Sequence, residues 1–442
     1  MKYVIIGGDA AGMSAAMQIV RNVENAKVTT LEMGDTYSYA QCGLPYAISG
    51  RIPKLDSLIA RTRDTFEEKY GIDARIFHKV EHVDEKAKLV SGTNLKTNET
   101  FSVPYDKLLV ATGARPLVPD WDGVNLKGVH TLKTIADAKA IMESATDAKN
   151  VTVIGGGYIG LEMAEAFHEL GKDVRIIQRG AQLANTFDLD MAEHINDEAE
   201  KQGIAVHLEE SVTALNGNGV VTEVITDKTS YETDLVLIAI GVIPNTELLD
   251  GTGVHKGVKG AIQVNRYMET NVKDIYAAGD CATQYHRVKE KDDFSPLGTH
   301  ANKQGRLAGL NMIKKTRPFQ GMVGTAILKF CDLSLGRTGL TENEAKELNL
   351  PYETTILTST NIAGYYPGKE KLHVKLLYRS DTKQLLGGQF VGIAGVAKRT
   401  DVIATALFHR MKIDELEDLD LSYAPPFNSV WDPVQQGARR SK

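Results

Sequence analysis

The pattern of apolar and polar positions predicts the same series of elements at two places along the chain. In each copy a short apolar run leads through a glycine-rich turn into a stretch of small and apolar residues, and a second apolar run follows. The expected elements are strand, helix and strand at 2–6, 13–20 and 27–32, and again at 151–154, 161–170 and 173–178. Strands joined by a helical crossover run parallel, so the two copies predict two α/β units.

The residues after Gly321 follow a different pattern. Short strands of alternating hydrophobicity are expected at 325–330, 372–378 and 385–392, followed by a helix at 402–411. Strands followed by a helix of this kind predict an α+β domain. The predicted fold class is therefore α/β, with two Rossmann-like domains and a C-terminal α+β domain.

Each glycine-rich turn lies between an expected strand and an expected helix. The turns read Gly7-Gly8-Asp9-Ala10-Ala11-Gly12 and Gly155-Gly156-Gly157-Tyr158-Ile159-Gly160. The helix that follows such a turn offers free N–H groups and a positive dipole to a pyrophosphate. Glu32 ends the second strand of the first copy, where a carboxylate would accept hydrogen bonds from ribose hydroxyls. A plain strand-to-helix turn is the alternative, but two copies in this context favour two dinucleotide sites.

The second copy departs from the first at the end of its second strand. It carries Gln178-Arg179 there, with no acidic residue. A carboxylate at this place would repel a 2′-phosphate, whereas Arg179 could pair with one. This predicts use of NADPH, or of both NADPH and NADH. The alternative is that Arg179 is a solvated surface charge.

Two further segments indicate a flavin. One is Leu109-Val110-Ala111-Thr112-Gly113-Ala114, and the other runs from Thr270 through an apolar strand to Asp280. The Asp280 carboxylate would hold the flavin ribitol; alternatively, it would cap the N-terminus of a helix.

Composition and charge argue against a nucleic-acid-binding, membrane-spanning or secreted protein. A net charge of −6 and a pI near 6.0 leave no basic surplus for binding nucleic acid. No run of 18 or more apolar residues predicts a membrane span. The first residues begin a strand directly, and three cysteines make no secreted disulfide framework, so we expect a cytoplasmic protein. No metal site is expected.

Cys42 is the candidate redox centre. It follows the first repeat in Ser38-Tyr39-Ala40-Gln41-Cys42-Gly43-Leu44-Pro45-Tyr46, and Cys281 and Cys331, read as packing residues, are far along the chain. A single thiol beside a flavin must pass electrons through a mixed disulfide, a persulfide or a sulfenic acid. We expect positive local potential and oxidised flavin to favour its thiolate. The alternative is a buried structural cysteine.

Together these motifs resemble the pyridine nucleotide-disulfide oxidoreductase family over essentially the whole chain. The resemblance implies a FAD-binding domain at 1–112 and 244–320, an NAD(P)-binding domain at 113–243 and a dimerisation domain at 321–442. The implied FAD contacts are Gly7, Gly8, Ala11, Gly12, Glu32, Ala111, Thr112, Gly113 and Asp280. The implied NAD(P)H contacts are Gly155, Gly157, Tyr158, Ile159, Gly160, Glu162, Gln178, Arg179 and Gly241.

Within that family, the segment around Cys42 is most similar to the coenzyme A-disulfide reductases. This implies a homodimer with shared sites, in which a small-molecule disulfide is reduced, coenzyme A is carried as a mixed disulfide on Cys42, and Tyr365 and Tyr423 reach the partner's cysteine. The implied coenzyme A contacts are Ser14, Gln18, Arg21, Ser38, Gln41, Arg61, Arg63 and Lys69. Surface placement alone would also explain these arginines, and capping of turns would explain the tyrosines.

Several features leave the substrate open. Tyr39 and Gln41 stand where some coenzyme A-disulfide reductases have Phe and Asn, and Ala10 stands where related peroxidases have a histidine. The alternatives are a per- or polysulfide reductase, an NADH oxidase, an electron-transfer reductase for a protein partner and a nucleotide sensor without turnover.

Overall fold

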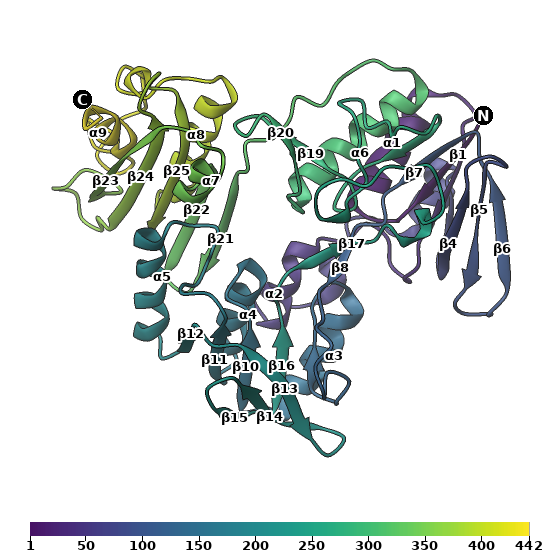
Figure 1. Cartoon of the computed structure of the whole chain (residues 1–442), viewed down its shortest axis with the longest axis horizontal. Coiled ribbons are helices and arrows are strands. Elements are labelled where there is room, and N and C mark those ends of the chain that lie inside the picture. The colour runs from purple at the N-terminus through teal and green to yellow at the C-terminus, as the bar shows by residue number, and fades with distance from the viewer. Residues whose placement is uncertain (442) are drawn as a thin grey trace.

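The computed structural model describes residues 1–441, which form three lobes (Figure 1). The first repeat forms β1 (Lys2–Ile6), α1 (Ala10–Asn22) and β2 (Lys27–Leu31). These strands join a parallel sheet of order β18-β7-β1-β2-β3, completed by β3 (Asp73–Arg75), β7 (Lys107–Val110) and β18 (Ile275–Ala277). The central strand β1 is buried beyond its first residue, which explains its continuous apolar run.

The second repeat forms an equivalent parallel sheet. It comprises β10 (Asn150–Ile154), α4 (Tyr158–Glu169) and β11 (Asp173–Gln178), as the sequence predicts. The strand order is β12-β11-β10-β16-β9, with β12 (Ala205–Leu208), β16 (Leu235–Ile238) and β9 (Val129–His130). Helices α3 (Ile135–Asp147) and α5 (Leu189–Lys201) belong to this lobe, which lies at the bottom of Figure 1.

Two small antiparallel sheets were not predicted. One consists of β4 (His78–Asp84), β5 (Leu89–Asn94) and β6 (Thr100–Pro104), and the other of β13 (Val212–Gly217), β14 (Val221–Thr226) and β15 (Ser230–Glu232). Each lies between two strands of a parallel sheet along the chain. Their half-exposed, polar strands lack the apolar runs that revealed the main sheets.

The chain crosses between the first and second lobes at two adjacent connections. Strands β8 (Ala114–Pro116) and β17 (Val242–Pro244) pair there in antiparallel register. Thr112 and Asn245 tie the connections together, because the Thr112 hydroxyl donates to the Asn245 carbonyl at 2.6 Å and the Asn245 amide donates back to Thr112 at 2.9 Å. The strands of the two parallel sheets fall within the predicted domain ranges, while the boundaries themselves stay a prediction.

Helix α6 (Gly298–Ile313) packs directly against α1 (Figure 1). Gly305 allows this approach, since a Cβ atom there would lie 2.1 Å from the carbonyl oxygen of Ala11. The hairpin of β19 (Gln284–His286) and β20 (Lys291–Asp293) precedes α6, and the short helix α2 (Leu44–Ile48) follows Cys42.

The C-terminal lobe is an antiparallel sheet of order β21-β22-β25-β24-β23. Its strands are β21 (Ala326–Phe330), β22 (Leu333–Gly339), β23 (Tyr352–Thr360), β24 (Lys371–Arg379) and β25 (Leu385–Gly392), and its helices are α7 (Glu342–Glu347), α8 (Val396–Phe408) and α9 (Pro433–Arg439). All of β25 is buried, because α8 and α5 both pack on it, so the expected alternation along this strand was wrong. Helix α8 also ends before 411, at Phe408, and Arg410 adopts a left-handed backbone.

No helix in residues 1–441 is long and apolar enough to cross a membrane.

Candidate active site

The first glycine-rich turn has the geometry of a phosphate-binding turn. Gly7 adopts a positive φ of 112°, and a Cβ at Gly12 would lie 2.0 Å from the Gly7 carbonyl oxygen, so both positions require glycine. The Glu32 carboxylate accepts from the backbone N–H of Gly8 at 2.7 Å. Burial raises the Glu32 pKa, and this N–H and that of Gly34 oppose the shift. These residues fit a FAD adenosine and pyrophosphate.

Asp9 stands in the first turn at the position where the second turn has Gly157. Its side chain accepts a hydrogen bond from the Gln41 amide at 2.7 Å, next to Cys42. Burial raises the Asp9 pKa to about 6. Asp9 thus connects the first turn to the cysteine loop, which sequence reasoning did not detect.

The second turn makes a hydrogen bond equivalent to one in the first turn. Gly155 has a positive φ of 103°, and a Cβ at Gly160 would lie 1.9 Å from the Gly155 carbonyl oxygen. The Gln178 side-chain oxygen accepts from the Gly156 N–H at 3.0 Å, as Glu32 does from Gly8. A Cβ at Gly157 would meet nothing within 4 Å, which leaves its backbone open to a phosphate.

The residue that bonds to the glycine-rich turn is uncharged in the second site and a carboxylate in the first. A neutral amide takes the place of the carboxylate, and the next residue, Arg179, is exposed. Gln178 and Arg179 thus lie at the C-terminal end of β11, and their expected contact with a coenzyme ribose stays a prediction.

Asp280 lies in a turn after β18, not at the start of a helix, because the next helix, α6, begins at Gly298. The alternative of a helix cap is therefore wrong. Its carboxylate pairs with Lys133 Nζ at 3.2 Å, and both side chains are about four-fifths buried. Lys133 stands between β9 and α3, outside every recognised motif, and it is the principal site residue that sequence reasoning missed.

The Cys42 thiol is exposed to solvent, so the alternative of a buried structural cysteine is wrong. It lies in a 3₁₀ turn, Gln41–Gly43, ahead of α2. Desolvation by its surroundings and the Glu162 carboxylate raise the pKa of Cys42, and Lys133 opposes them. The expected positive local potential is therefore not supplied by the chain, although the charge of Lys133 acts to lower the Cys42 pKa.

A second polar pair near the thiol includes Glu162, whose charge acts on Cys42. Tyr46, on α2, donates its hydroxyl to Glu162 of α4 at 3.3 Å. Burial and the charge of Glu165 raise the Glu162 pKa to about 7, while the Tyr46 hydrogen bond opposes the shift. The structure thus gathers Lys133, Glu162 and Asp280 around Cys42.

Tyr365 and Tyr423 lie on the C-terminal lobe and face solvent. Their hydroxyls are 3.1 Å apart, and the side chains are 75% and 46% exposed. The hydrogen bond to Tyr423 raises the Tyr365 pKa, so this phenol stays protonated at neutral pH. Within the chain they pair with each other, and their expected role at a partner's cysteine stays a prediction.

Some of the candidate coenzyme A contacts already bond to other residues of the chain, and others are exposed. Ser14, Gln18 and Arg21 share α1, and the Ser14 hydroxyl donates to Asn302 of α6 at 2.9 Å. Arg63 already bonds to Glu67 and to the Ala74 carbonyl, so its guanidinium is not free for a phosphate without rearrangement. The remaining candidates are Ser38, which has a left-handed backbone, Gln41, exposed Arg61, and Lys69, which lies 5.6 Å from the Tyr70 ring.

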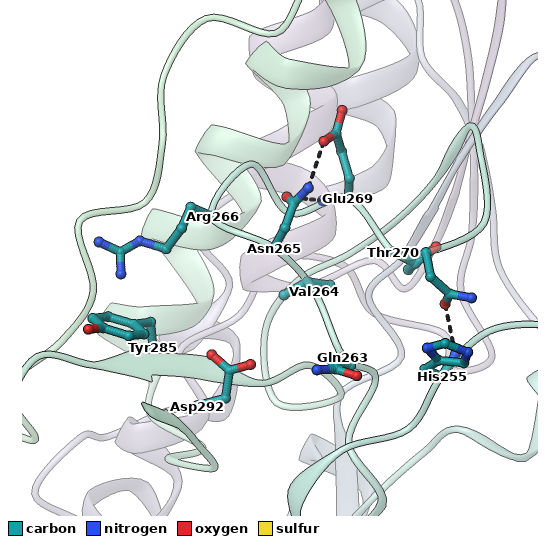
Figure 2. Close-up of a pocket in the computed structure, with 10 residues that line it drawn as sticks. His255, Gln263, Val264, Asn265, Arg266, Glu269, Thr270, Tyr285 and Asp292 are labelled. Atoms are coloured by element: carbon teal, nitrogen blue, oxygen red, sulfur yellow. Dashed lines mark hydrogen bonds between the residues drawn. The ribbon is translucent and has the colours of Figure 1, made fainter. Parts of the chain in front are cut away.

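A hollow of about 580 Å³ lies away from Cys42, between the 263–271 segment and the β19–β20 hairpin (Figure 2). Arg266 stacks over the Tyr285 ring at 4.0 Å and donates to the Phe319 carbonyl. Asn265 bonds to Glu269. Because neither Cys42 nor either glycine-rich turn lines this hollow, it is not the candidate active site.

Comparison with known proteins decides the family. A model described as pyridine nucleotide-disulphide oxidoreductase matches residues 1–305, and the dimerisation domain of the same family matches residues 325–433. The chain belongs to the pyridine nucleotide-disulphide oxidoreductase family. The expected fold class is confirmed, and this flavoprotein family uses FAD and NAD(P)H.

Full-length relatives carry more than one activity in their names. The chain is 39% identical to an NAD(P)H coenzyme A polysulfide/persulfide reductase from Pyrococcus horikoshii, covering 98% of this chain and 96% of the relative. It is 31% identical to a coenzyme A disulfide reductase from Staphylococcus aureus, covering 100% of both.

A solved structure bears on the coenzyme. An engineered water-forming NADPH oxidase, a mutant of the Lactobacillus brevis NADH oxidase, was solved with NADPH bound. It matches with a TM-score of 0.96 at 31% identity, over 100% of this chain and 98% of its own. Its mutations include replacement of one aspartate by alanine, and of an alanine and a proline by arginine.

Proposed function

We propose that this protein reduces coenzyme A disulfide with NAD(P)H, using Cys42 as its single redox thiol. The observation that carries the proposal is the exposed Cys42 beside Lys133, Glu162 and Asp280, with no second thiol suited to an internal pair. Cys281 is fully buried and bonded to the carbonyls of Val110 and Ala278. Burial and Glu165 raise the pKa of Cys331 to about 12, which disfavours its thiolate.

In the proposed reaction, electrons pass from the NAD(P)H site to the FAD site and then to Cys42. Gly7, Gly12 and Glu32 would hold FAD at the first turn, where it would supply two-electron transfer from NAD(P)H to the sulfur of Cys42. The chain's part is to hold the Cys42–coenzyme A mixed disulfide so that reduction releases one coenzyme A thiol and leaves the Cys42 thiolate. That thiolate attacks a coenzyme A disulfide, expels the second coenzyme A thiolate and restores the mixed disulfide, so that one disulfide yields two thiols.

The leaving thiolate needs a proton donor. The Tyr365–Tyr423 pair would supply it from the partner subunit, since an exposed pair of phenols on a dimerisation domain is available to a second copy. Lys133 would stabilise negative charge on Cys42 through space and on Asp280 directly.

Coenzyme choice follows from the second turn. The neutral Gln178 and exposed Arg179 support acceptance of NADPH, and the arginines introduced into the engineered NADPH oxidase parallel this charge pattern. A per- or polysulfide reductase is the second candidate, favoured by the higher identity to the Pyrococcus relative.

Mass spectrometry of the non-reduced protein tests the proposal. Coenzyme A bound to Cys42, released by dithiothreitol, is the expected result, together with NADPH-dependent turnover of coenzyme A disulfide. Turnover of polysulfide but not of coenzyme A disulfide would replace the first candidate by the second. Absence of any thiol-dependent turnover would refute both.

A further inference from the structure

The segment between β11 and α5, residues 179–188, joins the second glycine-rich turn to the C-terminal lobe. On the turn side, Ala184 donates its N–H to the Gly156 carbonyl at 2.7 Å, and Leu183 packs so closely that a Cβ at Gly156 would lie 2.4 Å from it. On the other side, Gln389 of β25 exchanges two hydrogen bonds with Asp188, of 2.8 and 2.7 Å. The segment is therefore fixed by two different lobes.

Thr186 makes contacts in both directions. Its hydroxyl donates to the Tyr158 hydroxyl at 3.0 Å, and its carbonyl accepts from Arg337 of β22 at 3.0 Å. Arg337 is itself held by Glu344 at 3.3 Å, and its side chain is only 11% exposed. A continuous series of bonds thus runs from the C-terminal lobe to the first residue of α4.

The backbone of this segment is strained. Ala184 adopts a positive φ of 46°, a conformation that a non-glycine residue holds only when its surroundings impose it. Ala184's own N–H bond to Gly156 and the bond from Arg337 to Thr186, two residues later, supply that constraint. A segment held in this way keeps the Thr186 hydroxyl in one place.

We infer that Thr186 is a positioning residue for the NAD(P)H site: it orients the Tyr158 ring, and the C-terminal lobe orients Thr186 through Arg337. The inference rests on the proposed function and on the expectation from the family resemblance that Tyr158 contacts NAD(P)H. A phenol in the first turn of a helix has rotational freedom that a hydrogen bond removes. Coenzyme binding to the oriented ring then loses less conformational entropy.

Thr186→Val tests this, because it keeps the β-branched shape and removes only the hydroxyl. Stopped-flow reduction of the bound flavin at increasing NADPH gives an apparent Kd and a limiting rate for the holoenzyme. The expected apparent Kd rises about three- to tenfold, as for one lost hydrogen bond, and the limiting rate changes less than about twofold. Thr186→Ser, which retains the hydroxyl, should restore the apparent Kd.

A double-mutant cycle separates positioning from general damage. Thr186→Val should have no further effect on the apparent Kd in a Tyr158→Phe background, because the bond is already absent. Thr213→Val, on an exposed hydroxyl of the same lobe that bonds only to the Ile225 carbonyl, is the matched control and should leave the apparent Kd unchanged.

Three outcomes would overturn the inference: an apparent Kd for Thr186→Val equal to that of the native enzyme, failure of Thr186→Ser to restore it, or independent multiplication of the two effects in the double variant. In each case NADPH would still reduce the native flavin. If neither NADPH nor NADH reduces the native flavin, the proposed function itself fails.

Discussion

Glu162→Gln should change the stability of the flavin-free chain in a pH-dependent way. Glu162 lies beside Cys42, and burial together with Glu165 raises its pKa to about 7. The amide retains an oxygen that can accept from Tyr46 at the same place. The substitution therefore removes the titration while keeping the shape and the hydrogen bond.

The direction of the effect on the free energy of unfolding follows from the number of protons that Glu162 binds in each state. Between its unfolded pKa of 4.5 and its native pKa of about 7, the native Glu162 binds more protons than the unfolded chain, so it destabilises the protein progressively as pH rises through this window. The full difference corresponds to at most about 3 kcal/mol above pH 7. Glu162→Gln should thus raise the stability by up to that amount at pH 8.5 and confer little of this gain at pH 4.5.

The assay is the thermal midpoint of native and variant chains across that pH range. Glu169→Gln, on the same helix, is the matched control, because the hydrogen bond from Arg51 lowers the Glu169 pKa. Its effect should have the opposite sign, a loss of stability at neutral pH that fades as pH falls. A Glu162→Gln midpoint shift that is the same at pH 5 and pH 8.5 would refute the reasoning.

Three other experiments test coenzyme choice, the contact between two lobes, and the sharing of sites between subunits. Arg179→Glu should raise the KM for NADPH about tenfold or more and that for NADH less than about twofold; a native preference for NADH of about a hundredfold would contradict this assignment. Lys375→Met should lower the unfolding free energy by about 3–5 kcal/mol in denaturant titrations, because this fully buried lysine neutralises buried Asp188 between two lobes. A loss below about 1 kcal/mol would contradict this role of Lys375. Mixing Cys42→Ser with Tyr423→Phe subunits should restore activity above both parents if sites are shared, and no rescue despite confirmed subunit exchange would exclude sharing.

The elements that depend on local pattern could be predicted from the sequence. Strands β1, β10 and β11 are short and rich in Val and Ile, and the positive φ at Gly7 and Gly155 requires the residue that marks each turn. These signals lie within a few neighbouring residues, so both glycine-rich turns between strand and helix were correctly located.

Features that depend on contacts between distant segments could not be predicted. Lys133 meets Asp280 across 147 positions of the chain, and no spacing rule connects them. The same applies to Thr186 and Arg337, which belong to different lobes. The raised pKa of Cys42 also depends on such contacts, which is why the sequence led us to expect a more favoured thiolate than the chain provides.

The most direct test of the central claim compares Cys42→Ser with Cys331→Ser in the holoenzyme. With NADPH as donor, both variants should reduce the bound flavin. Only Cys42→Ser should lose coenzyme A disulfide reduction, by about a hundredfold or more, while Cys331→Ser should stay within about twofold of the native rate. Near-native disulfide turnover by Cys42→Ser would contradict the single-thiol account.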